Sequence, residues 1–131
     1  MTRDELLAAA REAALRAHCP YSHFRVGAAL LAGDKLYTGA NIEISSYGLT
    51  LCAERSALAA ALSAGAGPIT HVAVACIDIP PTAPLNQRTP CGPCGACRQW
   101  LADLAPEATI YIDGATRDFS VPDLLPFAFE L

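Results

Sequence analysis

Two short stretches of the chain carry cysteines at spacings suited to binding a metal ion. The first is Cys52-Ala53-Glu54, and the second is Pro93-Cys94-Gly95-Ala96-Cys97. Two cysteines separated by two residues present two sulfurs from one turn, and Cys52 could supply a third. Three protein ligands leave a tetrahedral position open for water, which is typical of a catalytic zinc site. Glu54 is then the group that could move protons beside the metal.

Both cysteine stretches stand where a helix is expected to begin, and there the helix dipole favours the thiolate form that binds metal. On a regular helix, residues two apart point roughly 200° away from each other. Cys52 and Glu54 can therefore face one metal only if Cys52 lies at or before the first helical residue. The sequence predicts a helix from Cys52 to about Ala64, and another over 96–104.

The cysteines leave alternatives open. Cys91 could be a fourth ligand, which would close the site and make it structural. Pro90-Cys91-Gly92-Pro93-Cys94 also repeats the Pro-Cys-Gly-x-Cys pattern in an overlapping register, so the turn could use Cys91 and Cys94 instead of Cys94 and Cys97. Cys19 and Cys76 are expected to be buried small hydrophobic residues.

Composition excludes several classes of function. The 131 residues are 53% hydrophobic and 17% charged, with a mean hydropathy of +0.30. This fits one domain, residues 1–131, with either a large core or a surface covered by partner subunits. The net charge is −4 and the nine basic residues form no run, so no nucleic-acid polymer is expected as a partner. Charged residues in the N-terminal stretch, and the lack of a long apolar run, predict a cytoplasmic protein without a membrane span.

Helices and strands are predicted to alternate around the cysteines. Thr2 and Glu5 form a capping box that is expected to open a helix ending near Ala17. The expected strands are 26–31 and 35–40, which form a hairpin, then 71–77, 109–112 and 116–121. The proline-rich loop 80–93 is expected to contain no strand, and Leu124 to begin a short apolar tail. This order predicts an α/β layered fold with a mixed sheet.

Longer strings of the chain resemble the small cytidine deaminases, in the family's order across nearly its whole length. These strings are Pro20-Tyr21-Ser22 to Leu30, Asn41-Ile42-Glu43, Tyr47-Gly48-Leu49-Thr50, Cys52-Ala53-Glu54-Arg55, Pro93-Cys94-Gly95-Ala96-Cys97-Arg98-Gln99, and Leu124-Leu125-Pro126 with Phe129. The resemblance implies a three-layer α/β/α sandwich with a five-stranded mixed sheet. It also implies a homotetramer whose active sites borrow residues from neighbouring subunits. Arg98-Gln99 follows Cys97 as in the family, which favours the register with Cys94 and Cys97.

The function that the resemblance implies is zinc-dependent hydrolysis of free cytidine and deoxycytidine to uridine and deoxyuridine, with release of ammonia, in pyrimidine salvage. Glu54 would take a proton from water, pass it to ring N3 and later protonate the departing amine. Two alternatives are a non-catalytic zinc module with four cysteine ligands and a deaminase of another aminopyrimidine nucleoside.

Site residues follow from the resemblance by position. Cys52, Cys94 and Cys97 would bind zinc. Arg55 and Arg98 are expected to offset the charge of the sulfurs, because both stand close in sequence to these cysteines. The implied substrate contacts are Asn41, Glu43, Phe24, Ala53, Tyr47 and Phe129. Asn41 and Glu43 resemble the ribose-binding pair, and Ile42 between them is expected to point into the core, because residues two apart on an extended segment share a face. Phe24 would pack near the base, and Tyr47 and Phe129 would close a neighbour's site.

Overall fold

The computed structural model describes residues 1–80, 82–83 and 91–131. In this part of the chain, one mixed sheet has the strand order β2-β1-β3-β4-β5. β1 (Val26–Ala32) pairs antiparallel with both β2 (Lys35–Ala40) and β3 (Ile69–Cys76). β4 (Thr109–Ile112) runs parallel to β3 and antiparallel to β5 (Phe119–Ser120).

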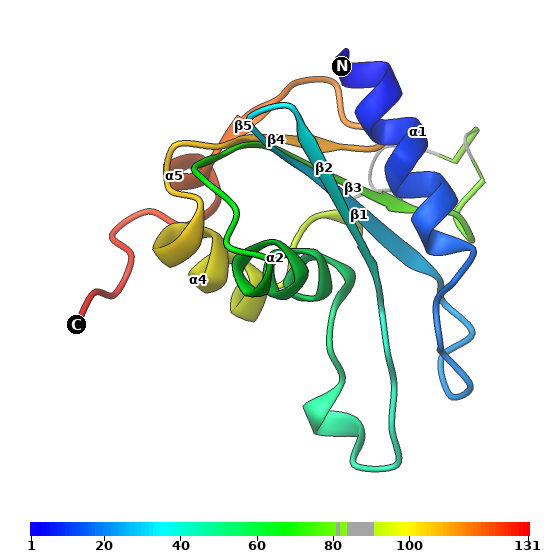
Figure 1. Ribbon diagram of the computed structural model, residues 1–131. Coiled ribbons are helices and arrows are strands. Elements are labelled where there is room, and N and C mark those ends of the chain that lie inside the picture. Colours follow the sequence, from blue (N-terminus) through cyan, green and yellow to red (C-terminus); the bar gives the residue numbers. More distant parts are fainter. Residues whose placement is uncertain (81, 84–90) are drawn as a thin grey trace.

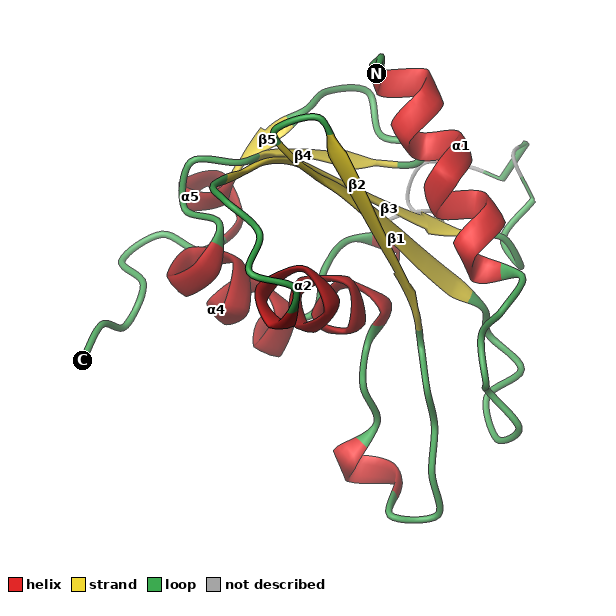
Figure 2. Cartoon of the chain, viewed as in Figure 1, coloured by secondary structure: helices red, strands yellow, loops and turns green. Residues whose placement is uncertain are grey.

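Helices cover both faces of this sheet. Figure 1 shows α1 (Arg3–Ala14) on one face, with α2 (Ala53–Ser63) and α4 (Gly95–Leu104) on the other. Figure 2 shows the same view coloured by secondary structure, with helices on both sides of the strands. The predicted three-layer α/β/α sandwich with a five-stranded mixed sheet is confirmed.

α1 begins as the sequence predicts and ends earlier. The Thr2 side chain accepts a hydrogen bond from the Glu5 backbone N–H, and the Glu5 carboxylate accepts one from the Thr2 N–H. The helix ends at Ala14 and not near Ala17, because the next three backbone N–H groups bond three residues back, as in a tighter turn.

The central strand β3 is covered on both faces, as predicted. Val72 and Val74 join the larger cluster under α2 and α4, whereas Ala73 and Ala75 join the smaller cluster under α1. Alternate residues of a strand point to opposite faces, so one strand supplies both cores.

Two glycines let helices contact the sheet through backbone atoms. A Cβ at Gly27 of β1 would lie 1.9 Å from the carbonyl oxygen of Ala10 in α1. A Cβ at Gly39 of β2 would lie 2.4 Å from the backbone nitrogen of Ala57 in α2. Each position therefore requires a residue without a side chain.

The last elements differ from the prediction. The strand expected over 116–121 is limited to Phe119–Ser120, and α5 (Val121–Leu124) follows at once. Residues 125–131 form no helix or strand, so the tail expected from Leu124 begins one residue later. Ser120 caps α5 in a capping box with Asp123. The proposed loop 80–93 lies largely outside the described residues, so its lack of strand remains a prediction. Among the described residues, no helix combines the length and apolar character needed to cross a membrane.

Candidate metal centre and active site

The two cysteine stretches meet at the start of α2 and α4. The Sγ atoms of Cys52 and Cys94 lie 3.6 Å apart, and those of Cys94 and Cys97 lie 3.5 Å apart. Two sulfurs bound to one tetrahedral zinc, each at about 2.3 Å, would be about 3.8 Å apart, whereas a disulfide would hold them about 2 Å apart. The donor type and spacing therefore fit a zinc ion. Among the described residues, these three form the one group with metal-site spacing, and Cys91 is not part of it.

Local backbone structure explains how the sulfurs converge. Cys52 is the N-cap of α2 and Cys94 the N-cap of α4, and both have extended backbone angles. The expectation that Cys52 precedes the first helical residue is confirmed, because α2 begins at Ala53. Cys97 lies one turn into α4 and is fully buried. The positive ends of both helix dipoles therefore face the thiolates.

Arg55 lies directly against the sulfur of Cys52. Its Nη2 donates to Cys52 Sγ at 3.2 Å and to the carbonyl oxygen of Thr50 at 3.1 Å. Hydrogen bonds from Cys97, Arg55 and Cys94 together lower the pKa of Cys52 to about 5, against the opposing effect of burial. The guanidinium therefore favours a thiolate at this position.

Glu54 is buried beside the sulfurs. It is the second residue of α2, is 4% exposed and lines the same cavity as Cys52 and Cys94. Burial raises the pKa of Glu54 to about 7. A carboxyl group with such a pKa can both accept and release a proton near neutral pH.

The cavity at these residues has a volume of about 160 Å³. It is lined by Val26, Asn41, Thr50, Cys52, Ala53, Glu54, Val74, Cys91, Gly92 and Cys94. Of the expected substrate contacts, it therefore contains Asn41 and Ala53. Sequence reasoning assigned no site role to Val26, Val74, Thr50 or Gly92. Thr50 stands in one of the family-like strings, whereas the two valines look like ordinary strand residues.

Asn41 joins the cavity to the start of β1. Its Oδ1 accepts a hydrogen bond from the backbone N–H of Val26 at 2.9 Å, and its Nδ2 donates to the carbonyl oxygen of Phe24 at 2.8 Å. Both ends of the amide are thus fixed, and Asn41 is 7% exposed. Phe24 is partly buried against the larger core cluster.

Glu43 is buried in a network of its own. Its Oε1 accepts from the backbone N–H groups of Tyr21 and Ser22, and its Oε2 accepts from the Ser22 hydroxyl at 2.5 Å. Burial opposes ionisation, but these bonds hold the pKa of Glu43 below its ordinary value. The expectation for Ile42 was wrong. Asn41 and Glu43 face inward, while Ile42 is 43% exposed and does not enter the core.

Three other expected residues lie away from the cavity in a single chain. The Tyr47 ring packs edge-on against Tyr21, with ring centres 5.9 Å apart, and Phe129 is exposed near the C-terminus. Arg98 donates from Nε to the carbonyl oxygen of Pro93 and from Nη1 to that of Leu124. These bonds support the turn before Cys94 through its backbone, a role that sequence position alone did not suggest.

Comparison with known proteins gives one consistent result. Residues 1–113 match the family described as the cytidine and deoxycytidylate deaminase zinc-binding region. The chain is 43% identical to the cytidine deaminase of Halalkalibacterium halodurans, over 98% of this chain and 95% of that protein. The crystal structure of cytidine deaminase from Burkholderia pseudomallei is 41% identical, covers 98% of this chain and 100% of its own, and has a TM-score of 0.84. That from Mycobacterium tuberculosis is 38% identical, covers 100% and 99%, and has a TM-score of 0.83.

Proposed function

The chain belongs to the cytidine and deoxycytidylate deaminase family, and we propose that it hydrolyses free cytidine and deoxycytidine to uridine and deoxyuridine, with release of ammonia. One observation carries this proposal. Three cysteine sulfurs at zinc-site spacing and a buried glutamate with a raised pKa line one small cavity. A structural zinc site would need a fourth protein ligand and no proton carrier.

Cys52, Cys94 and Cys97 would hold the zinc, which, when bound, lowers the pKa of water and so supplies a nucleophile at neutral pH. Arg55 balances part of the negative charge of the sulfurs through its contact with Cys52 Sγ. We assign no such role to Arg98, which supports the turn from its backbone side.

Glu54 would carry the protons of the reaction. Its carboxylate accepts a proton from the attacking water and transfers it to ring N3, which makes C4 of the base more electrophilic. The carboxylate then takes the second proton of that water from the new hydroxyl group on C4 and gives it to the amino group, the C4–N bond breaks and ammonia leaves. One side chain thus acts as base and acid in turn. A pKa of about 7 supports this double role, because neither protonation state is strongly disfavoured at neutral pH.

We further propose that the sugar and base are bound by Asn41, Glu43, Phe24 and Ala53. Asn41 and Ala53 line the cavity, and the carboxylate of Glu43 is held on the same inward side as Asn41. A free nucleoside can bring its base to the cavity without being flipped out of a stacked polymer. The pyrimidine salvage role and a cytoplasmic location are proposed on family resemblance.

A homotetramer would complete the site from outside the chain. The segment that follows β2 extends beyond the body of the sheet (Figure 1). It exposes large apolar side chains to water, which is typical of a surface covered by a partner subunit. They are Ile42, Ile44, Tyr47 and Leu49. Tyr47 and Phe129, which lie away from the cavity of their own chain, are proposed to close the site of a neighbour.

Turnover of the Glu54→Gln protein tests the mechanism. The zinc-loaded variant and wild type are compared by the ultraviolet absorbance change on cytidine and by ammonia release, with zinc content measured in parallel. The variant is expected to keep one zinc per chain and to lose about 10³-fold or more in kcat. Near-normal kcat would remove Glu54 from the mechanism. A wild-type zinc with four sulfur ligands, or turnover confined to another aminopyrimidine nucleoside, would contradict the proposed function.

A further inference from the structure

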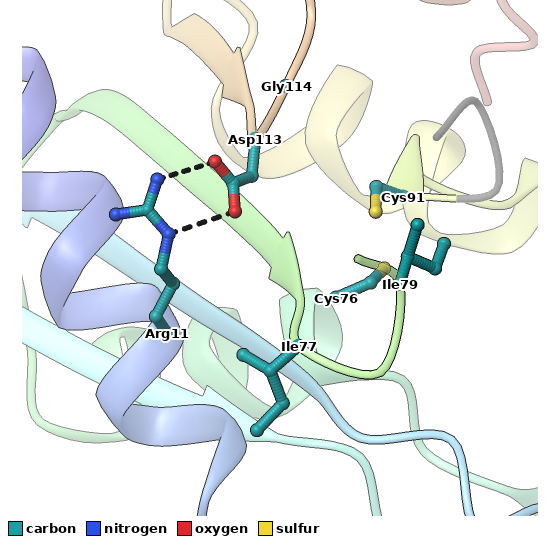
Figure 3. Close-up of a pocket in the computed structure, with 7 residues that line it drawn as sticks. All are labelled: Arg11, Cys76, Ile77, Ile79, Cys91, Asp113 and Gly114. Carbon is teal, nitrogen blue, oxygen red and sulfur yellow. Dashed lines mark hydrogen bonds and ion pairs between the residues drawn. The ribbon is translucent and has the colours of Figure 1, made fainter. Parts of the chain in front are cut away.

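Two thiols outside the metal cluster lie next to each other in a second cavity. Cys76 is the last residue of β3, and Cys91 stands in the turn before α4. Both line a cavity of about 440 Å³, on the side away from the Arg11–Asp113 ion pair (Figure 3). They are 5% and 3% exposed, respectively. Residues distant in sequence thus place two sulfurs at one wall of an open cavity.

The two thiols also interact. A hydrogen bond between their side chains is the largest cause of the raised pKa of Cys76. The two side chains are therefore in contact at one wall of the cavity, and a disulfide would join neighbouring sulfurs.

Cys91 connects this cavity with the metal centre. It lines both the 440 Å³ cavity and the cavity that contains Cys52 and Glu54. It also begins the first of the two overlapping Pro-Cys-Gly-x-Cys patterns, and the zinc cluster uses the second pattern only. The zinc site thus leaves Cys91 without an assigned role, although it stands three residues before a proposed ligand.

We propose that Cys76 and Cys91 are a reversible oxidation site that closes to a disulfide when the protein meets a peroxide. The sulfur of Cys91 attacks one peroxide oxygen, the O–O bond breaks, and a sulfenic acid forms as the peroxide is reduced. The sulfur of Cys76 then attacks Cys91, the S–S bond forms, and the sulfenic oxygen leaves as water with the thiol proton. Two thiols and one hydrogen peroxide give one disulfide and two waters.

The bond would tie the turn that carries Cys94 to the end of β3. It would also close the segment between Cys76 and Cys91 into a covalent loop, which lowers the conformational freedom of the unfolded chain. Oxidation is therefore expected to raise the thermal midpoint of the zinc-loaded protein. The oxidant must be small enough to enter the cavity, whereas the proposed zinc ligands would be protected by their metal.

The experiment treats the zinc-loaded full chain with hydrogen peroxide, then denatures it with a chelator and alkylates the remaining thiols. The intact mass should show four alkylated cysteines per chain, where the untreated protein shows six, which corresponds to one internal disulfide. Reduction with dithiothreitol before alkylation should restore six. Trypsin cleaves after Arg55, Arg88 and Arg98, so the bond should link peptide 56–88 to peptide 89–98. Fragmentation of the second peptide should place the bond at Cys91, and zinc measured before denaturation should be unchanged.

Matched variants decide the assignment. Cys76→Ala and Cys91→Ala should each lose the disulfide and the rise in thermal midpoint, whereas Cys19→Ala should keep both. Three results would overturn the proposal: a bond to Cys94 or Cys97, loss of zinc on oxidation, or the same loss of two alkylated thiols in Cys76→Ala. Peptide mapping of the wild type gives the answer even if a variant folds poorly. Glu54→Gln should oxidise like wild type, so this result is independent of whether the proposed deamination is correct.

Discussion

Glu43 and Glu54 are buried to nearly the same extent, yet their carboxyl groups behave in opposite ways. Glu43 is 3% exposed and Glu54 is 4% exposed. Burial works against ionisation of both, but hydrogen bonds from Ser22 and Tyr21 hold the pKa of Glu43 below its ordinary value. For Glu54, burial dominates and the pKa rises to about 7.

The difference shows that donors, and not burial alone, decide whether a buried carboxyl group keeps its charge. Glu43 is an anion at neutral pH that fixes the loop containing Tyr21 and Ser22. Glu54 stands at the N-terminus of α2 beside the sulfurs, where hydrogen bonds from its own backbone N–H and from Cys97 do not offset burial, and it can exchange a proton. The sequence predicts that both carboxylates serve the substrate, and their different surroundings predict different roles for them.

The largest expected difference between variants of the two glutamates is in their activity on cytidine and on free cytosine. Glu54→Gln should slow cytidine and free cytosine alike, because proton transfer serves both. Glu43→Ala should lower kcat/KM for cytidine about a hundredfold, the loss expected for a hydrogen bond to a charged group, and leave any residual action on free cytosine little changed. Asn41→Ala should follow Glu43→Ala.

Steady-state kinetics on both substrates make this measurement. Ser22→Ala is the control, because it removes a donor to Glu43 without removing a proposed sugar contact, and its effect should be smaller. Equal losses on cytidine and cytosine in Glu43→Ala would argue against a sugar contact.

The next effect concerns how α2 holds Glu54 in place. Gly39→Ala would force a Cβ against the backbone of Ala57 and Ala53, and Gly27→Ala would do the same against Ala10 in α1. Each should destabilise the protein by about 3 kcal/mol, at the upper end of the usual cost of overpacking. Gly39→Ala should also lower kcat, because Ala53 adjoins Glu54, whereas Gly27→Ala should leave the kcat of the folded fraction unchanged.

Urea denaturation measures the loss of stability in each variant, and steady-state kinetics measure its kcat. A loss of kcat in Gly27→Ala as large as in Gly39→Ala would contradict the view that α2 alone positions Glu54, because Gly27 lies under the opposite face.

The smallest expected effect is a pH dependence of stability at Glu43. The folded-state pKa is below the ordinary value of 4.5, so the unfolded chain binds more protons in this range and stability falls as pH falls. The contribution is complete above pH 4.5 and is lost as pH falls through the lowered folded-state pKa. Glu43→Gln should be less stable than wild type at neutral pH, and the difference should shrink in acid.

Denaturant midpoints of both proteins, measured from neutral to acidic pH, test this sign. Comparing the two proteins removes what they share, zinc loss included. A difference that stays constant with pH would mean that Glu43 stabilises the fold through packing and not through its charge.

Local signals predicted most of the fold. Three features depend only on neighbouring residues and could be predicted without the tertiary structure. They are the capping box at Thr2, the hairpin of β1 and β2, and the apolar stretch in β3. α5 was missed because it has only four residues, although Ser120 and Asp123 carry a capping signal.

Features that depend on distant contacts could not be predicted so well. Strand alternation correctly put Asn41 and Glu43 on one face but could not say which face is covered. That depends on residues 18–24, whose backbone meets Asn41 and Glu43, and Ile42 is left exposed. Likewise, Arg98 was expected at the sulfurs because it follows Cys97, but its guanidinium reaches the carbonyl oxygens of Pro93 and Leu124.

The contact between Arg98 and Leu124 also bears on the order in which the protein folds. The turn that carries Cys94 receives this support from a carbonyl of α5, 26 residues further along the chain. A helix can form locally before distant segments pack against it, but the full set of bonds around the turn exists only after α5 has packed beside α4. Metal uptake by the finished turn would then follow that packing step.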